Sequence, residues 1–471
     1  MAELLTLTRA DLDRRTLTAR IKALAREHGL TVAAVTGAEP FAGLEQALRD
    51  HIRSGHADGM PWFDESRARV AADPRQLHAN ARSILSVGIA YWDDRTPPSD
   101  GLPRGRIARY AWGRDYHKVL KRRMLALLGA VAELAGGSVE ARALVDTARI
   151  SDRAVAARAG LGWFGKHSCV IVPGHGSWVL LGELLLDLDL EPDQPLSKDC
   201  GRCTICIDRC PTGAIVAPYT VSAPRCLSFQ TIEQRGSVPL EIRPLMGPWV
   251  FGCDVCQEVC PYTGVAARAD DAELKPAHVD NAFPPLAWLL SMSRDEFLGR
   301  YAGTAVMRAK RRGLARNAAI AIGNTGDPAL VPALVQALGS HDEPLVRGHA
   351  GWALGRMGGP SARQALDGRR GRDVATVDAE IVAALSAMCL WMSAATLCFA
   401  DHTRGASSDR RSRPVRIAAR YRRALRPHRH RRGRRRHHRS RCRPLLLWRR
   451  RHRPAAPWLP TRQAPRPALP A

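Results

Sequence analysis

The sequence has 471 residues and only 12 Cys, which excludes a small disulfide-stapled fold and indicates roughly three domains. Its formal net charge is +26, but residues 401–471 alone hold 24 Arg and two Asp, so the remaining residues are nearly neutral. The N-terminal segment MAELLTLTRADLDRRTLTAR contains acidic residues and no apolar core of signal-peptide length, so we predict a cytoplasmic protein. In that reducing compartment, clustered cysteines indicate metal ligands or catalysts.

The first 195 residues alternate between helical and strand patterns. We expect helices at 17–29, 117–135 and 151–163, and strands at 83–92, 141–146, 169–174 and 177–190. This alternation predicts an α/β catalytic domain over residues 1–195. The glycines of GLGWFGKHS do not form a GxGxxG pattern after a strand, and no P-loop is present, so neither nucleotide-binding signature is found.

Residues 200–215, CGRCTICIDRCPTGAI, contain four Cys within eleven positions. Their spacing, C-x2-C-x2-C-x3-C-P, is that of bacterial ferredoxins, in which the fourth Cys ligates the other cluster of a two-cluster protein. A second run, VFGCDVCQEVCPYTG, lacks the first Cys and has Val250 in its place, and Cys226 is the nearby thiol that can fill the gap. Paired zinc sites are the alternative, although a zinc ribbon usually has two separated C-x2-C pairs.

We therefore predict a ferredoxin-like domain over residues 196–265 with two [4Fe-4S] clusters. The first cluster is assigned to Cys200, Cys203, Cys206 and, by exchange, Cys260. The second cluster is assigned to Cys253, Cys256, Cys226 and, by exchange, Cys210. The thiols of Cys169, Cys389 and Cys398 have no partners at ligand spacing and are expected to be buried among apolar groups.

After the cysteines the chain becomes helical and repetitive. In LARNAAIAIGNTGDPALVPALVQAL and LVRGHAGWALGRMGGPSARQAL, Gly323 matches Gly355, 32 residues later. Paired helices with this period predict a HEAT-like domain over residues 266–385, with an ordinary helical bundle as the alternative. Residues 381–400 carry no charge and have transmembrane length, but they are rich in Ala and continue the preceding helix, so we predict no membrane anchor.

Residues 386–471 are predicted to form a basic, disordered tail, because they lack hydrophobic periodicity. Such a tail could bind phosphates electrostatically. The alternative, which we favour, is an out-of-frame extension of a GC-rich gene.

Several segments together resemble the epoxyqueuosine reductase family over about residues 20–380. They are GRIARYAWGRDYHKVL (105–120), VDTARISDRAVAARAGLGWFGKHS (145–168), GSWVLLGELLLDLDLEPD (176–193) and CLSFQTIEQRGSVPLEIRPLMGPWVFGCDVCQEVCP (226–261). The resemblance implies a cobalamin-binding catalytic domain like that of the reductive dehalogenases, joined to two [4Fe-4S] clusters. It also implies the reaction, which is reduction of epoxyqueuosine to queuosine at the wobble position of tRNA.

The resemblance further implies roles for particular residues. Positions that match the family's cofactor contacts are Arg69, Arg109, Asp146, Ser228, Cys253 and Asp254. Asp146 matches the proton donor, although the residues alone favour a cap for the helix that follows. An Asp that donates a proton at neutral pH needs a raised pKa, so we expect Asp146 to be buried away from cations.

A D-x-H-x-x-G pattern, in which a protein His ligates the cobalt of cobalamin, is absent. The nearest match, Asp115-Tyr-His117, has Leu120 in place of the glycine. We therefore predict base-off cobalamin without a protein imidazole on cobalt, and a structural role for His117.

The expected partners are tRNA carrying epoxyqueuosine and an external low-potential electron donor, and the protein is expected to be a monomer. Two other functions stay open from the sequence. One is a cobalamin-dependent reductive dehalogenase, which usually carries an export signal. The other is a non-catalytic ferredoxin-like electron carrier with an RNA-binding helical stack, which would bind no corrin.

Overall fold

A computed structural model describes residues 13–404 of the chain, with side-chain surroundings through residue 389. The chain divides into two units, residues 1–389 and residues 390–471, and the architecture below is that of the first unit. Within the described residues, no helix is both long and apolar enough to cross a membrane. Most of the predicted tail, residues 405–471, lies outside the described residues, as does the side chain of Cys398.

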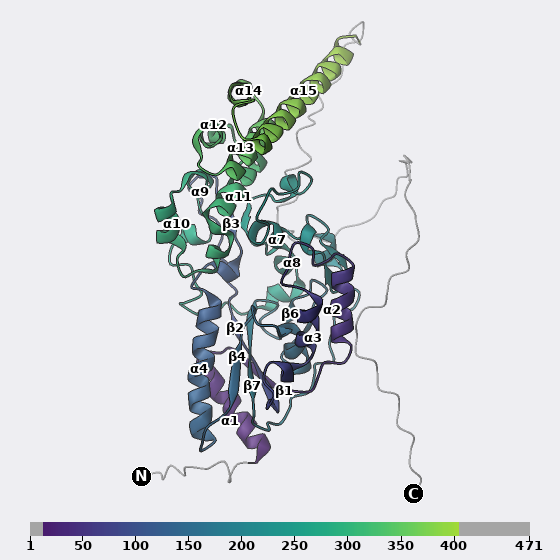
Figure 1. Cartoon of the computed structure of the whole chain (residues 1–471), viewed down its shortest axis with the longest axis vertical. Helices are drawn as coiled ribbons and strands as arrows, with labels where there is room; N and C mark the ends of the chain where they lie inside the picture. The colour runs from purple at the N-terminus through teal and green to yellow at the C-terminus, as the bar shows by residue number, and fades with distance from the viewer. Residues whose placement is uncertain (1–12, 405–471) are drawn as a thin grey trace, which may run out of the picture. The chain divides into compact units, whose positions relative to one another are not determined.

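A four-stranded sheet forms the centre of the N-terminal region (Figure 1). Its strands, in spatial order, are β1 (Val32–Gly37), β2 (Ser83–Ala90), β7 (Val179–Leu186) and β4 (Ala141–Leu144). All three neighbouring pairs are antiparallel. Three of the four expected strands are therefore in this sheet, and the fourth, at 169–174, contains residues 170–171 of a separate two-stranded sheet. The alternation with helices did not reveal that the strands pair antiparallel, and β1 was not predicted.

Helices cover both faces of this sheet, which explains why every residue of β2 is buried. Helices α1 (Arg14–Glu27) and α4 (Tyr116–Leu134) pack on one face, against Leu85 and Leu184. Helix α5 (Asp152–Arg158) packs on the other face, against Ile84 and Leu185. Because successive side chains of a strand point to opposite faces, Ser86 and Glu183 belong to the face covered by α5.

Short elements surround the two cysteine runs. They are α6 (Ile205–Asp208), β8 (Ile215–Ala217), β9 (Thr220–Val221), α7 (Leu227–Ile232), β10 (Trp249–Phe251) and α8 (Val255–Glu258). Helices α6 and α8 contact each other and each carries one Cys of a run. Strand β10 pairs in parallel with β3 (Arg106–Ile107), which joins this region to the N-terminal part. The remaining elements of the N-terminal part are α2 (Leu44–Arg53), α3 (Glu65–Ala72), β5 (Trp163–Phe164) and β6 (Val170–Ile171).

The C-terminal part is a stack of helices that share one large core. They are α9 (Leu286–Ser291), α10 (Arg294–Tyr301), α11 (Lys310–Thr325), α12 (Val331–Ser340), α13 (Pro344–Met357), α14 (Pro360–Arg369) and α15 (Ala375–Arg404). A Cβ on Gly323 would lie 2.9 Å from the Cβ of Ala353, and one on Gly355 would lie 2.5 Å from that of Ala384. The repeated glycine is thus the point of closest approach between α11 and α13 and again between α13 and α15, so the 32-residue period reflects a structural repeat.

Candidate active site

Asp146 lies two residues beyond the end of β4, in a left-handed backbone conformation with φ of 41°. Asp and Asn tolerate this conformation better than most residues, and strained positions of this kind often accompany function. Arg67 supports the turn by donating to the backbone oxygen of Ala148 at 2.5 Å. The cap residue of α5 is Ser151, so the alternative role of Asp146 as a helix cap is excluded.

The carboxylate of Asp146 meets the first turn of α4. The hydroxyl of Tyr116 donates to its Oδ2 at 2.6 Å, and Nε2 of His117 lies 3.1 Å from the same oxygen. The other ring nitrogen of His117, Nδ1, lies 2.8 Å from Oδ1 of Asp115. His117, which the sequence led us to treat as structural, therefore links two carboxylates.

The expectation that Asp146 is buried away from cations with a raised pKa is wrong. Its side chain is 57% exposed. Burial by itself raises the pKa of Asp146, but the hydrogen bonds from His117 and Tyr116 outweigh this effect and lower it. The reverse holds for His117, because burial lowers its pKa and the hydrogen bonds to Asp115 and Asp146 raise it to about 9. At neutral pH, His117 and Asp146 thus form one unit that holds one transferable proton.

A cavity of about 220 Å³ opens beside Asp146. Its lining comes from several elements and consists of Tyr91, Tyr116, Asp146, Asp152, Arg153, Cys169, Val170, Val172, Ser177, Val179, Leu180, Leu181 and Gln257. Gln257 is adjacent to Cys256 in the chain, and its side-chain amide donates to the backbone oxygen of Ser177 at 2.8 Å. The cavity is therefore lined at once by Asp146 and by the chain neighbour of Cys256.

The cysteines gather in two groups, each of which mixes thiols from both runs. Burial raises the pKa of Cys206 to about 11, and the charges of Cys200, Cys260 and Cys203 add to this effect. Such an interaction requires the four thiols to be close together. They are the four predicted for the first cluster.

The second group shows the same mixing. Burial raises the pKa of Cys256, and the charges of Cys253, Cys226 and Cys210 contribute in the same direction. These are the four thiols predicted for the second cluster, with Cys210 contributed by exchange from the first run. Cys169 also faces this group and lines the cavity, but it belongs to neither run.

Backbone N–H groups point at several of these sulfurs, as cluster thiolates require. The N–H of Ala214 donates to Sγ of Cys210 at 3.2 Å, and those of Ser228 and Phe229 bond Cys226. Within the described residues, no three His, Cys, Asp or Glu side chains are close enough to hold a single metal ion. Thiols grouped in fours, with members from both runs in each group, suit a cluster whose iron and sulfide atoms fill the space between them.

Arg109 and Asp254, two of the predicted cofactor contacts, form a buried ion pair. Nη1 of Arg109 lies 3.0 Å from Oδ2 of Asp254 and 2.7 Å from Oε1 of Glu258. Burial raises the pKa of Asp254 to about 6, against the opposing charge of Arg109. Neither residue lines the cavity beside Asp146, so the contacts seen here hold the segment that carries Cys253, and a cofactor role for the pair stays a prediction.

The other predicted contacts are divided between two places. Ser228 lies next to Cys226, at the start of α7. Arg69 lies on α3 and lines a second cavity, of about 470 Å³, together with Arg49 and Asp73. The two cavities share no lining residue, so the structure does not bring Arg69 to Asp146.

Sequence reasoning missed several groups at this site. Tyr116 and Asp115 were noticed only as part of an incomplete D-x-H-x-x-G pattern, although their position at a helix start beside His117 was a usable signal. Asp152 and Glu183 were not singled out at all. One thiol was also misjudged, because Cys389 is exposed and not buried.

Comparisons with known proteins bear directly on this arrangement. Residues 72–147 match the family described as epoxyqueuosine reductase QueG, residues 199–263 match a 4Fe-4S double cluster binding domain, and residues 304–386 match HEAT repeats. The chain is 40% identical over 349 residues to an epoxyqueuosine reductase from Xanthomonas campestris pv. campestris, covering 72% of this chain and 96% of that protein. The chain belongs to the epoxyqueuosine reductase family.

Other epoxyqueuosine reductases support the same assignment. The Escherichia coli K12 enzyme is 37% identical over 353 residues, covering 74% of this chain and 91% of that protein. A crystal structure of epoxyqueuosine reductase with an epoxyqueuosine-modified tRNA-Tyr stem loop superposes with a TM-score of 0.73 at 31% identity, covering 79% of this chain and 98% of that one. The predicted enzyme class, an oxidoreductase, is thereby confirmed, as are the two-cluster domain and the HEAT repeats.

Proposed function

We propose that this epoxyqueuosine reductase family member reduces the epoxide of epoxyqueuosine in tRNA to the alkene of queuosine. One observation carries the proposal: Asp146, which is hydrogen-bonded to His117, lines a cavity that is also lined by Cys169, which lies close to Cys256, and by Gln257, the chain neighbour of Cys256. Removal of an epoxide oxygen as water consumes two electrons and two protons. The cavity is where both can be delivered.

The chain's own residues have distinct tasks in this reaction. The two cysteine groups hold the clusters that pass electrons one at a time toward the cavity. Asp146 accepts hydrogen bonds from Tyr116 and His117 while it is ionised. When negative charge develops on the departing oxygen, the proton of His117 can move along the 3.1 Å hydrogen bond to Asp146 and on to that oxygen.

Cobalamin is the cofactor expected at this cavity. The lining includes the apolar side chains of Val170, Val172 and Val179, and no His is among the described residues that line it. This lining fits a flat, largely apolar corrin bound in the base-off form without a protein imidazole on cobalt. When bound, cobalamin would supply the low-valent cobalt chemistry that side chains lack.

The cofactor assignment has a spectroscopic test. Reconstituted protein should show a Co(II) electron paramagnetic resonance spectrum without nitrogen hyperfine splitting. Splitting from a nitrogen ligand would show that an imidazole binds cobalt and would contradict the proposed arrangement.

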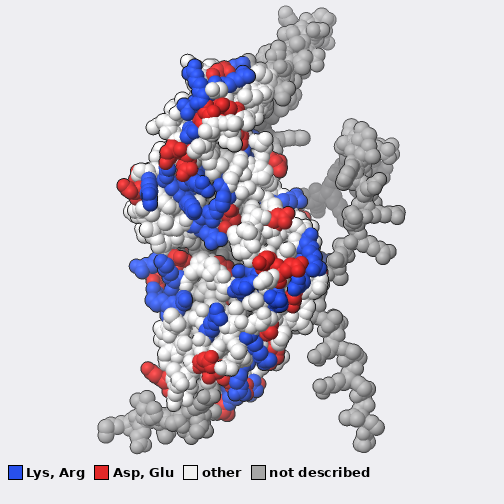
Figure 2. Space-filling model, viewed as in Figure 1, with Lys and Arg blue, Asp and Glu red and all other residues white. Residues whose placement is uncertain are grey.

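The tRNA partner is proposed from chemistry and from the solved relative that holds a modified stem loop. Lys and Arg side chains gather over α10 and α11 on one face of the molecule (Figure 2), and such basic surfaces bind the phosphate backbone. We further propose an external low-potential electron donor, a monomeric state and a cytoplasmic location. The domain division proposed is residues 1–195, 196–265, 266–385 and 386–471.

An anaerobic turnover assay tests the proposed function. Protein loaded with both clusters and cobalamin is incubated with a chemical reductant and tRNA that carries epoxyqueuosine, and the nucleosides are identified by mass spectrometry. Queuosine should appear as epoxyqueuosine disappears. Fully loaded protein that leaves epoxyqueuosine unchanged would overturn the proposal.

A further inference from the structure

Glu183 is a carboxyl group buried in the middle of the central sheet. It lies on β7 directly across from Ser86 on β2 and from Leu144 on β4, and it is 0% exposed. Within the described residues, neither of its carboxyl oxygens accepts a hydrogen bond from an N–H or hydroxyl donor, and the hydroxyl of Ser86 is also without a partner. A buried carboxylate without a donor is strongly disfavoured, so this group needs another way to be stabilised.

Asp152 provides that stabilisation. It is the first residue of α5, which covers the same face of the sheet, and its buried Oδ1 likewise lacks an N–H or hydroxyl donor. The carboxyl groups of Asp152 and Glu183 interact with each other. Because no N–H or hydroxyl donates to Oδ1 of Asp152 or to either oxygen of Glu183, a hydrogen bond between the two carboxyls requires that one of them carries a proton. Two adjacent buried carboxyls cannot both ionise, so the pair shares one proton at neutral pH.

The surroundings do not remove this proton. The titratable and charged groups that face the pair are Asp146, Arg153, Arg67 and Tyr116. Asp146 disfavours ionisation of both carboxyls, whereas Arg153 and Arg67 favour ionisation of Asp152 alone. Burial outweighs the two arginines and raises the pKa of Asp152 to about 6, and burial together with Asp152 raises that of Glu183 further.

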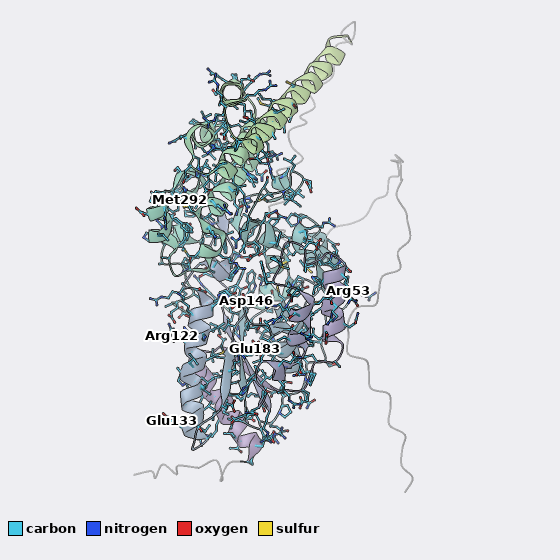
Figure 3. The ribbon with its side chains drawn as sticks, in the orientation of Figure 1. Arg53, Arg122, Glu133, Asp146, Glu183 and Met292 are labelled. Carbon is cyan, nitrogen blue, oxygen red and sulfur yellow. The ribbon has the colours of Figure 1, made fainter. Side chains whose placement is uncertain are left out.

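The pair also lies beside the proton-bearing unit. Leu144 is the residue of β4 opposite Glu183, and Asp146 follows two residues later, just beyond the end of the strand. Asp152 and Asp146 both line the 220 Å³ cavity. Figure 3 shows Asp146 and Glu183 together at the sheet, away from the other labelled residues.

The proposed reaction needs two protons, and the unit of Asp146 and His117 holds one. We propose that Asp152 and Glu183 supply the second proton, which passes from Asp152 through the cavity to Asp146. In this reaction both carbon–oxygen bonds of the epoxide break and a carbon–carbon double bond forms. The oxygen leaves as water, with two electrons from the clusters, one proton from the unit of Asp146 and His117, and one proton from the pair of Asp152 and Glu183. Solvent then returns one proton to the pair and one to the unit of Asp146 and His117. This inference rests on the proposed function.

Glu183→Gln and Asp152→Asn test the inference, because each keeps the side-chain size and breaks the pair that shares the proton. The first readout does not need activity: the infrared carbonyl stretch of a protonated, buried carboxyl should be present in the wild type and absent from Glu183→Gln, and it should shift in Asp152→Asn, which leaves Glu183 buried but without its partner carboxyl. Asp187→Asn is the matched control, since Asp187 lies just beyond β7, is only half-buried and accepts an N–H bond from Glu140 at 3.1 Å. It should leave the infrared band unchanged.

The second readout is single-turnover reduction by fully loaded protein. Each variant should retain its iron, its cobalamin and its KM for the tRNA, and lose about 10²-fold in rate. Because solvent must then supply the second proton, the rate of each variant should rise as the pH falls, and a small weak acid should restore part of it.

Three results would overturn the inference. The first is the absence of the infrared band from the wild type. The second is normal turnover with an unchanged pH profile in Asp152→Asn. Because Asp152 lines the cavity, this variant tests the inference even if Glu183→Gln does not fold. The third is fully loaded wild type that leaves epoxyqueuosine unreduced, with the infrared band present. That result would refute the proposed function itself, and the role of the pair with it, whereas the other two would leave the proposed function intact.

Discussion

Replacing Asp146 with Asn removes one carboxylate from a chain of hydrogen bonds and changes little else. Asn has nearly the same size and also tolerates the left-handed backbone at this position, where φ is 41°. The variant should therefore fold and keep both clusters. It loses the negative charge that accepts hydrogen bonds from Tyr116 at 2.6 Å and from His117 at 3.1 Å.

The size of the effect on His117 follows from its two carboxylate contacts. A rise of its pKa from 6.5 to about 9 corresponds to roughly 3 kcal/mol in favour of the protonated ring. Asp115 at 2.8 Å and Asp146 at 3.1 Å share this contribution, so loss of Asp146 should lower the pKa of His117 by about one unit. Because this pKa is raised in the folded state, the stabilisation is complete below about pH 6.5 and is lost as the pH rises through about 9.

Two measurements check this prediction. Nuclear magnetic resonance of ring-labelled histidine, assigned with His117→Gln, should show the lower pKa in Asp146→Asn. Turnover of epoxyqueuosine-containing tRNA should fall by about 10²–10⁴-fold. Asp115→Asn is the control, because it should also lower the pKa of His117 while retaining more turnover. If Asp146→Asn keeps its cofactors and near-normal turnover, the acid of the reaction lies elsewhere.

Three further predictions concern the clusters, the helical stack and the tail. Cys226→Ser should lose about half of roughly eight iron atoms and keep the signal of the first cluster, and colourless protein with stoichiometric zinc would refute the cluster assignment. Gly323→Ala should lower the melting temperature by an amount equivalent to about 1–3 kcal/mol, because its methyl group would clash with Ala353, whereas Gly368→Ala has open space and should be neutral. Truncation after Ala400 should leave turnover intact and reduce only salt-dependent, sequence-independent RNA affinity; loss of turnover in a folded truncation would show that the tail is functional.

The grouping of the cysteines could be predicted from the sequence because the pattern behind it is local. Fixed spacings of two and three residues place thiols around short helices, and the exchange of the fourth Cys belongs to the same pattern. The helical repeat was visible for a similar reason, since Gly323 and Gly355 each lie where successive helices come closest.

The protonation of the site could not be predicted, because it depends on contacts between distant segments. Tyr116 and Asp146 are 30 residues apart and meet only because α4 packs against β4 and β7. Glu183 appears in the sequence as one of three acidic residues in the apolar run LLGELLLDLDL. Only the sheet register, which places it opposite Ser86 and Leu144, and the position of α5 bring Asp152 to it.

The central claim is that this chain reduces epoxyqueuosine in tRNA, with Asp146 in the proton path. Its most direct test is mass spectrometry of tRNA nucleosides from a strain that lacks the gene, complemented with the wild type or with Asp146→Asn. The deletion strain should accumulate epoxyqueuosine, the wild type should restore queuosine, and Asp146→Asn, expressed at the same level, should leave epoxyqueuosine in place. A deletion strain whose tRNA still contains queuosine and no epoxyqueuosine would contradict the account.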